Sequence, residues 1–320
     1  MALHAEWFTG DVMQFMTGIL LCLATSLGIL LTFLTPNSTD PKSSKSSKAA
    51  STWFADAKTN PAKRAWEMFN LQYAVVWIGC FAVIIAFSLY ETFDALSYLV
   101  VCGGLCIPIL AFPLWNVHPS EVALPLAQRF AVKAIVWLAI YSFIGNYWYT
   151  HYFYNVLGAS FSFPSWRLND VPIPLYFATF FYFCMYHSLS NLPIRKVVTT
   201  FKPNAMRTAT LVVLVAVMAY VTAFMETLTI SGFPYYTFED KNMAYIIGSA
   251  FYGIYFIVRQ AFPMFYAFGE WPHEYQADRR RSSLEAMWST SVHSMGGGML
   301  ILTLLDLVRL LVGEELLIKG

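Results

Sequence analysis

Six ionisable side chains lie within long apolar runs of this 320-residue chain, at His151, His187, Glu226, Arg259, Asp306 and Arg309. Carboxyl and imidazole groups are the common proton donors and acceptors in enzymes. An ionisable group inside a membrane is costly, so each one is a candidate for function. The chemistry that these residues suggest is proton transfer in apolar surroundings.

Glu226 is the first candidate for a proton donor. It lies about one helical turn inside the end of its apolar run, and neither lysine nor arginine lies within a turn of it in sequence. A carboxyl group that is removed from water without a cationic partner keeps its proton and can donate it. A carboxyl group that reaches out to water at the membrane surface is the equal alternative.

Two further pairs of polar residues have the spacing of one helix face. Asp306 and Arg309 are three residues apart, which fits a structural ion pair and also leaves Asp306 as a second candidate acid. His187 and Asn191 are four residues apart. A polar contact between helices is the simpler interpretation of this pair, and His187 remains a candidate for substrate binding.

Aromatic residues gather around His151 and in two loops. His151 follows Tyr147 by four residues, so both are expected on one surface, with His151 as an interfacial residue or as a base. The loops 153–171 and 231–242 are aromatic and contain proline. Such loops could cap an apolar pocket, and their rings could stabilise a cation. The aromatic candidates are Tyr147, Trp148, Trp166, Tyr235 and Tyr236.

The composition excludes several classes of protein. Hydrophobic residues make up 58% of the chain and charged residues 12%, about half the charged fraction of a soluble domain. A net charge of +1 gives no basic face for nucleic acid. The five cysteines have no CxxC spacing, which argues against a zinc site or a disulfide framework. The sequence contains no glycine motif for binding phosphate.

These features predict an all-α fold, a polytopic membrane helical bundle with about eight transmembrane helices. Fifteen of the 20 lysines and arginines fall in one set of alternate loops, and three fall in the other set. This bias places the basic loops in the cytosol and both termini in the lumen. The apolar runs lie near 12–34, 71–90, 95–115, 130–152, 172–194, 208–230, 243–268 and 288–312.

Three regions are expected along the chain. Residues 1–60 hold the first span, near 12–34, and a linker rich in serine and lysine that is typical of a flexible cytosolic segment. Because the linker separates this span from the rest, the span is expected to be an appendage. Residues 61–312 form the helical-bundle domain, and residues 313–320 form a short lumenal tail.

The segment YSFIGNYWYTHYFYNVLGASFSFPSWRLNDVP (141–172) closely resembles the central signature of the cycloeucalenol cycloisomerase family, the cyclopropyl sterol isomerases of plants and algae. The resemblance extends over roughly residues 60–312. Residues 1–60 have no counterpart in the family, and Arg259 adds a charge that the family pattern lacks. Matching stretches are LYETF (89–93), YHSLSN (186–191), FMET (224–227), FPYYTFED (233–240), FYGIYFIV (251–258) and ILTLLDLVRL (301–310).

The resemblance implies that the chain opens the cyclopropane ring of cycloeucalenol to give obtusifoliol, in the endoplasmic reticulum membrane and without a cofactor. An acid must protonate the ring methylene and a base must remove a neighbouring proton. Glu226 is the first choice for the acid, Asp306 the second, and His151 is the candidate base or proton relay. The five aromatic candidates would shield the cation, and Asn146 could anchor the sterol hydroxyl group.

Other functions remain open at this point. A sterol double-bond isomerase or a sterol-binding protein without catalysis would have a similar aromatic membrane pocket. A transporter would need polar residues along the full membrane depth, whereas the candidates here lie mostly toward one side. The expected partners are membrane lipid and the sterol, with other sterol-pathway enzymes as candidates if the chain acts as a scaffold.

Overall fold

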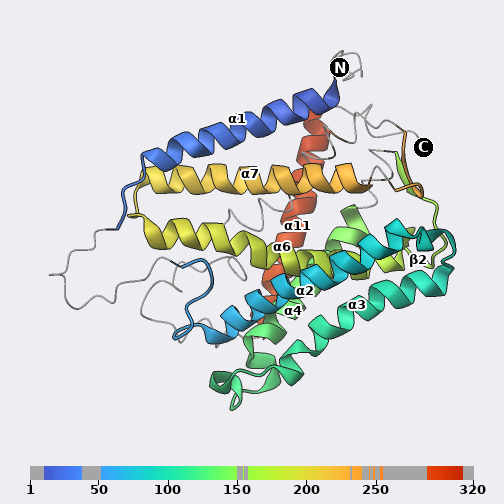
Figure 1. Cartoon of the computed structure of the whole chain (residues 1–320), viewed down its shortest axis with the longest axis horizontal. Coiled ribbons are helices and arrows are strands. Elements are labelled where there is room, and N and C mark those ends of the chain that lie inside the picture. Colours follow the sequence, from blue (N-terminus) through green and yellow to red (C-terminus); the bar gives the residue numbers. More distant parts are fainter. Residues whose placement is uncertain are drawn as a thin grey trace.

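The computed structural model describes residues 11–37, 52–149, 154, 158–230, 233–239, 245, 248, 253–254 and 287–312. This part of the chain is mostly helical (Figure 1). Its long helices are α1 (Val12–Thr32), α2 (Pro61–Ala86), α3 (Ala95–Trp115), α4 (Phe130–Ile144), α6 (Ile173–Thr200), α7 (Ala205–Ile230) and α11 (Met287–Val312). Short helical turns are η2 (Leu89–Glu91), η3 (Pro119–Glu121), η4 (Leu126–Gln128) and the π-helix η5 (Gly145–Tyr149).

Five segments are long and apolar enough to cross a membrane: Val12–Thr32, Pro61–Ala86, Ala95–Trp115, Phe130–Trp148 and Ala205–Leu228. Large apolar side chains on these helices point outward, such as Val75, Phe87 and Ile107. Lipid tails solvate such a surface, whereas water does not. The predicted membrane bundle is therefore confirmed in its class. The run 243–268 lies almost entirely outside the described residues, so the count of eight and the side of the termini stay predictions.

Two helices are longer than the sequence predicted. α2 begins at Pro61 rather than near residue 71, and α6 continues to Thr200 rather than ending near residue 194. Both predictions were wrong because a search for apolar residues stops at the first charges. Arg195, which was expected in a loop, lies within α6 and is buried. Proline at the first helical position of α2 needs no hydrogen-bond partner for its nitrogen, which favours a start there.

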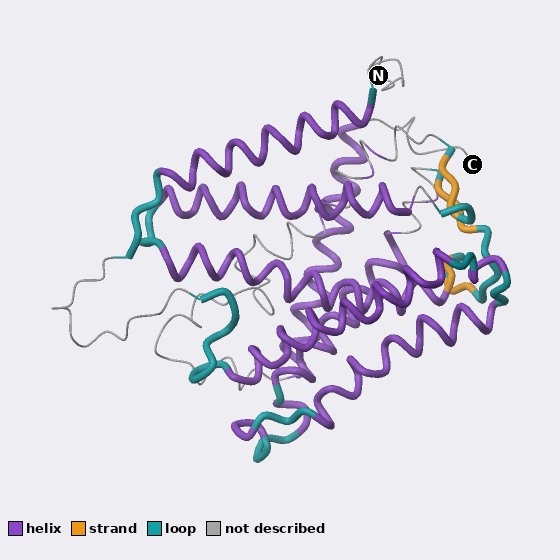
Figure 2. The backbone as a smooth tube through the Cα atoms, in the orientation of Figure 1, coloured by secondary structure: helices purple, strands orange, loops and turns teal. Residues whose placement is uncertain are grey.

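The helix ends gather in two places (Figures 1 and 2). The basic end contains the segments 33–37, 52–60, 116–129 and 201–204. The aromatic end contains the segments 87–94, 158–172 and 233–239. These segments alternate along the chain in the order that the charge pattern predicted.

The aromatic end also contains short strands. β1 (Ala159–Phe161) pairs antiparallel with β4 (Tyr236–Phe238), with Ser160 opposite Thr237. β2 (Arg167–Leu168) pairs with β3 (Val171–Pro172). Gly158 adopts a φ of 54°, which favours glycine, and a Cβ there would lie 2.6 Å from Cγ of Glu239. The two aromatic loops are thus joined to each other, although they are far apart in sequence.

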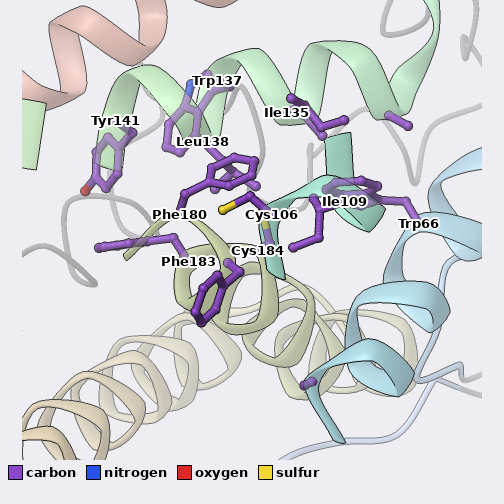
Figure 3. Packing of buried hydrophobic residues seen from close by; sticks show 14 of the residues in the cluster. Trp66, Cys106, Ile109, Ile135, Trp137, Leu138, Tyr141, Phe180, Phe183 and Cys184 are labelled. Carbon is purple, nitrogen blue, oxygen red and sulfur yellow. The ribbon is translucent and has the colours of Figure 1, made fainter. Parts of the chain in front are cut away.

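The main core lies where α4 crosses α6 and α3 (Figure 3). Trp137 stacks on Tyr141 at a ring-centroid distance of 4.7 Å, and Tyr141 meets Phe183 of α6 at 5.7 Å. α11 packs on the same helix α4, where Oγ of Ser294 donates a hydrogen bond to the carbonyl of Trp137 at 2.7 Å. α4 is therefore the helix around which the others are placed.

The first span packs along α7 rather than standing apart as an appendage (Figure 1). Val12 and Met16 contact Phe224, and Leu34 contacts Leu214. Beyond the C-terminal end of α1, the backbone N–H of Asn37 donates a hydrogen bond to the carbonyl of Thr200 at 2.9 Å. The expectation from the linker was wrong because connection length says little about packing.

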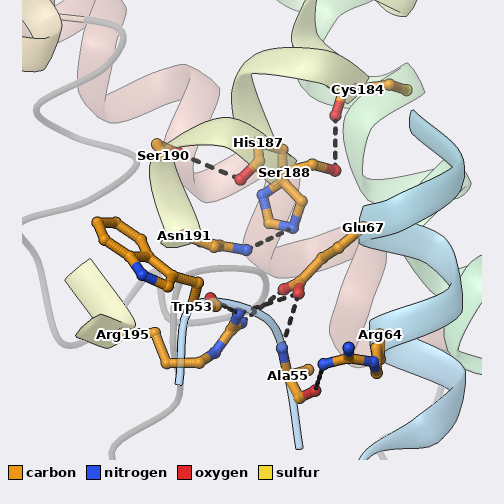
Figure 4. A network of polar contacts seen from close by, with 10 residues as sticks. All are labelled: Trp53, Ala55, Arg64, Glu67, Cys184, His187, Ser188, Ser190, Asn191 and Arg195. Atoms are coloured by element: carbon orange, nitrogen blue, oxygen red, sulfur yellow. Dashed lines mark hydrogen bonds and ion pairs between the residues drawn. The ribbon is translucent and has the colours of Figure 1, made fainter. Parts of the chain in front are cut away.

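A buried ion pair joins α2 to α6 at the basic end (Figure 4). Arg195 donates to both oxygens of Glu67, at 2.5 and 3.0 Å, and both side chains are fully buried. Arg195 also donates to the carbonyl of Trp53 at 2.8 Å, and Glu67 accepts from the backbone of Ala55 at 3.0 Å. This network fixes α2, α6 and the segment before α2 against one another.

The first prediction concerns the approach of α11 to α4. A Cβ at Gly298 would lie 2.8 Å from Cγ2 of Ile144, so Gly298→Ala is expected to cost about 1–3 kcal/mol. Thermal unfolding followed by tryptophan fluorescence measures this loss. Gly104→Ala is the control, because nothing lies within 4 Å of a Cβ there. Equal melting temperatures for the two variants would contradict the close approach.

The second prediction concerns the ion pair. Glu67→Met or Arg195→Met alone leaves a buried charge without its partner and is expected to cost about 3–5 kcal/mol. The double variant should recover most of this loss, because it removes both charges. Lys196→Met is the control, since Lys196 lies over the ring of Trp53 and is only partly buried. Additive losses in the double variant would show that the two side chains do not stabilise each other.

Candidate functional site

Glu226 lies in the last turns of α7 and is partly buried. Glu226 lies close enough to the phenol groups of Tyr182, Tyr186 and Tyr236 to interact with each of them electrostatically. Tyr182 and Tyr186 belong to α6, whereas Tyr236 belongs to β4. We call these four residues the Glu226 cluster. The cluster brings α6, α7 and strand β4 of the aromatic end together around one carboxyl group.

Tyr236 reaches the cluster from the aromatic end. Its side chain is 5% exposed and packs against Phe161 of the paired strand, at a ring-centroid distance of 4.5 Å. Burial raises the pKa of Tyr236 well above its usual value, and the charge of Glu226 and the neighbouring Tyr154 raise it further. The phenol of Tyr236 therefore stays protonated and can donate a hydrogen bond. The pairing of β1 with β4 is what places it there.

Tyr182 and Tyr186 are one turn apart on α6, and their rings lie 5.9 Å apart. Tyr182 also contacts Trp77 of α2 at 4.4 Å. At about 1.5 Å per residue, Tyr182 lies about 14 Å along the axis from the first residue of α6. Sequence reasoning missed both tyrosines because it searched for charged groups. The signal was present as two hydroxyl-bearing rings at helical spacing in an apolar run.

The Glu226 cluster combines two chemical properties. A carboxyl group can transfer a proton, and phenols can donate hydrogen bonds to it in either protonation state. The faces of the tyrosine and tryptophan rings carry negative charge density, which attracts a cation. A reaction that protonates an apolar substrate and forms a cation could use both properties in this place.

Asn146 lies in the π-helix η5 and is buried. Its amide donates to the carbonyl of Ser142 at 2.9 Å, and its oxygen accepts from the hydroxyl of Thr179 at 3.1 Å. π-helical turns often occur at functional sites. η5 widens the last turn of α4, and it places Asn146 against α6 at a polar contact between the two helices.

The other aromatic candidates lie at the aromatic end with ring partners of their own. Tyr147 stacks on Phe143 at 6.0 Å, and its carbonyl accepts from the amide of Asn169 at 2.6 Å. Tyr235 meets Tyr90 at 6.0 Å. Trp148 and Trp166 are each 51% exposed. The structure thus brings Tyr236 into the Glu226 cluster and leaves the two tryptophans on the outer surface.

His187 is fully buried on another face of α6. Its Nε2 lies 3.3 Å from the amide nitrogen of Asn191, as the one-turn spacing predicted. Arg195 follows one turn later, so His187 belongs to the polar row that ends in the Glu67–Arg195 ion pair (Figure 4). This contact lies within α6, whereas the sequence favoured a contact between helices.

Four residues singled out from the sequence lie outside this geometry. His151 and Arg259 lie outside the described residues, and Asp306 and Arg309 lie in α11 with their side chains outside them, so their ion pair stays a prediction. In the described part of the chain, no group of three His, Cys, Asp or Glu side chains is placed to hold a metal ion. The described cysteines are free thiols.

The chain matches a curated relative over most of its length. The protein named cycloeucalenol cycloisomerase from Arabidopsis thaliana is 36% identical over 270 residues, which cover 83% of this chain and 91% of the relative. No model of a protein family matches the chain, and no solved structure matches it. An identity of this size over nearly the whole relative confirms the resemblance seen in the sequence. The chain belongs to the cycloeucalenol cycloisomerase family, and it is an isomerase.

Proposed function

We propose that this chain opens the 9,19-cyclopropane ring of cycloeucalenol to give obtusifoliol. A proton adds to the ring methylene, which becomes a methyl group, and the broken carbon–carbon bond leaves a tertiary cation on the sterol. A neighbouring carbon then loses a proton to a base, and its bonding electrons form the ring double bond. The atoms of substrate and product balance, and no electron is gained or lost.

Membership of the cycloeucalenol cycloisomerase family supports this reaction, and the Glu226 cluster carries the proposal. Glu226 serves as the acid, and the phenols of Tyr182, Tyr186 and Tyr236 lie close enough to interact with its carboxyl group electrostatically. The rings of the cluster and of Trp77 stabilise the sterol cation. Preorganised groups of this kind lower the barrier because they need not reorient as the charge forms.

The remaining roles follow from position and polarity. His151 serves as the base or proton relay, and Asp306 is the second candidate for the acid. Asn146 anchors the sterol hydroxyl group, since its amide already bridges α4 and α6. Tyr147, Trp148, Trp166 and Tyr235 line the approach from the aromatic end, whereas the buried His187 has a structural role in the polar row of α6. The proposed location is the endoplasmic reticulum membrane, with membrane lipid and the sterol as partners.

The proposal is tested with the purified chain in lipid nanodiscs, incubated with cycloeucalenol in deuterated water. We expect obtusifoliol with deuterium in its new methyl group, followed by mass spectrometry and NMR. Deuterium there shows direct protonation of the ring. Unchanged substrate with folded protein would contradict the proposal and favour a protein that binds sterols without converting them. A product that keeps the cyclopropane ring would indicate a sterol double-bond isomerase.

The third prediction concerns the acid. Glu226→Gln removes the transferable proton and keeps the size of the side chain, so kcat should fall about 10²–10⁴-fold. Glu239→Gln is the matched control, because Glu239 is an exposed carboxyl group at the same end of the bundle. The control should retain its turnover. Near-normal turnover of Glu226→Gln would remove Glu226 from the mechanism, and Asp306→Asn would then be the variant to measure.

A further inference from the structure

α7 lies between α1 and α6 (Figure 1). Tyr220 and Phe224 are one turn apart on α7 and face α1, where they pack against Val12 and Met16. Glu226 follows Phe224 by two residues, which is a rotation of about 200° around a helix. The side of α7 that carries Glu226 is therefore opposite the side that α1 covers. This agrees with the action of the Glu226 charge on two tyrosines of α6.

The contact between α1 and α7 is narrow and specific. Along the 21 residues of α1, the buried side chains are Val12 and Met16. The hydroxyl of Tyr220 donates to the carbonyl of Met16 at 3.2 Å and lies 3.2 Å from its sulfur. Met16 is 1% exposed. These contacts lie at the level of the last turns of α7, which is where Glu226 projects from the other side.

The far end of α1 is tied to the end of α6 and to the turn that leads into α7. The backbone of Lys202 donates to the carbonyl of Thr35 at 2.9 Å, and the amide of Asn37 donates to the carbonyl of Thr199 at 3.0 Å. A bridge between Pro36 and Phe201 completes this junction. α1 is thus held at both ends of α7, by backbone hydrogen bonds at one end and by Tyr220 and Met16 at the other.

Lipid tails are as apolar as the face of α7 that α1 covers. Burial of that face therefore adds little stability, because lipid would solvate it equally well. What lipid cannot supply is a hydrogen-bond acceptor for Tyr220 or a shaped surface beside Phe224. The contribution of α1 is then a fixed position for α7, rather than protection of an apolar surface from water.

We propose that the N-terminal helix α1 is a positioning element of the catalytic unit, which holds α7 against α6 and so aims Glu226 at the substrate. This inference rests on the proposed function for the identity of the acid. Tyr220 and Met16 act through Glu226 and do not touch the sterol. A displacement of about 1 Å at a reacting group can cost on the order of a hundredfold in rate, so a loosened α7 lowers kcat.

The fourth prediction tests this role in the full-length chain in nanodiscs. The variant Met16→Ala/Tyr220→Phe removes the buried side chain and the hydroxyl donor, and should lower kcat about tenfold with KM within twofold. Met16→Leu alone should keep the wild-type rate, because it conserves volume and leaves the hydrogen bond from Tyr220 to the Met16 carbonyl in place. Leu21→Ala is the control, since Leu21 lies on the outer face of α1 and is 62% exposed. The amount of folded protein should be equal in all variants.

An unchanged kcat in the double variant would overturn the inference. A fall in activity that follows the amount of folded protein, with normal turnover per folded molecule, would also overturn it and make α1 a stabilising element only. A wild-type chain that converts no cyclopropyl sterol contradicts the proposed function instead. In that case the position of Glu226 is followed by the infrared absorption band of its carboxyl group, which is identified by its loss in Glu226→Gln. The band should shift between the wild-type chain and the double variant Met16→Ala/Tyr220→Phe, and an unshifted band would refute the role of α1.

Discussion

Hydrocarbon offers no hydrogen bonds, so the polar groups of this bundle have to find their partners within the protein. The Glu67–Arg195 pair is the strongest case, since two full charges are buried and linked by two hydrogen bonds. Asn146 meets Thr179 and Ser142 in the same way. The Glu67–Arg195 and Asn146–Thr179 contacts each join two helical segments that the apolar surfaces alone would leave free to slide. Polar pairing therefore decides the register of the helices, while apolar packing fills the space between them.

The same constraint shapes the surroundings of Glu226. Phenol groups and ring faces of Tyr182, Tyr186 and Tyr236 lie close to its carboxyl group. A carboxyl group paired with an arginine, as Glu67 is, stays ionised and cannot protonate carbon. Glu67 stabilises a helix contact, whereas the proposed reaction uses Glu226 as a proton donor.

The aromatic end connects the site to the outside of the bundle. Strand β4 carries Tyr236 into the Glu226 cluster, and its pairing with β1 is the feature that fixes this position. The neighbouring tryptophans Trp148 and Trp166 remain half exposed, as is common for residues at a membrane–water interface. Aromatic side chains therefore extend at this end of the bundle from the outer surface to the buried Tyr236.

The sequence by itself determined the membrane class and most helix positions, because apolar run length and charge bias are local properties of the chain, and its motifs identified the family. The choice of Glu226 as the acid stays a prediction. Only the tertiary structure decided what surrounds Glu226, since Tyr182 and Tyr186 lie about forty residues before it and face it from another helix. The burial of Arg195 was equally beyond the sequence, because it depends on Glu67 from α2. The packing of α1 was hidden for the same reason: apolar residues that face lipid and those that face another helix look alike along the chain.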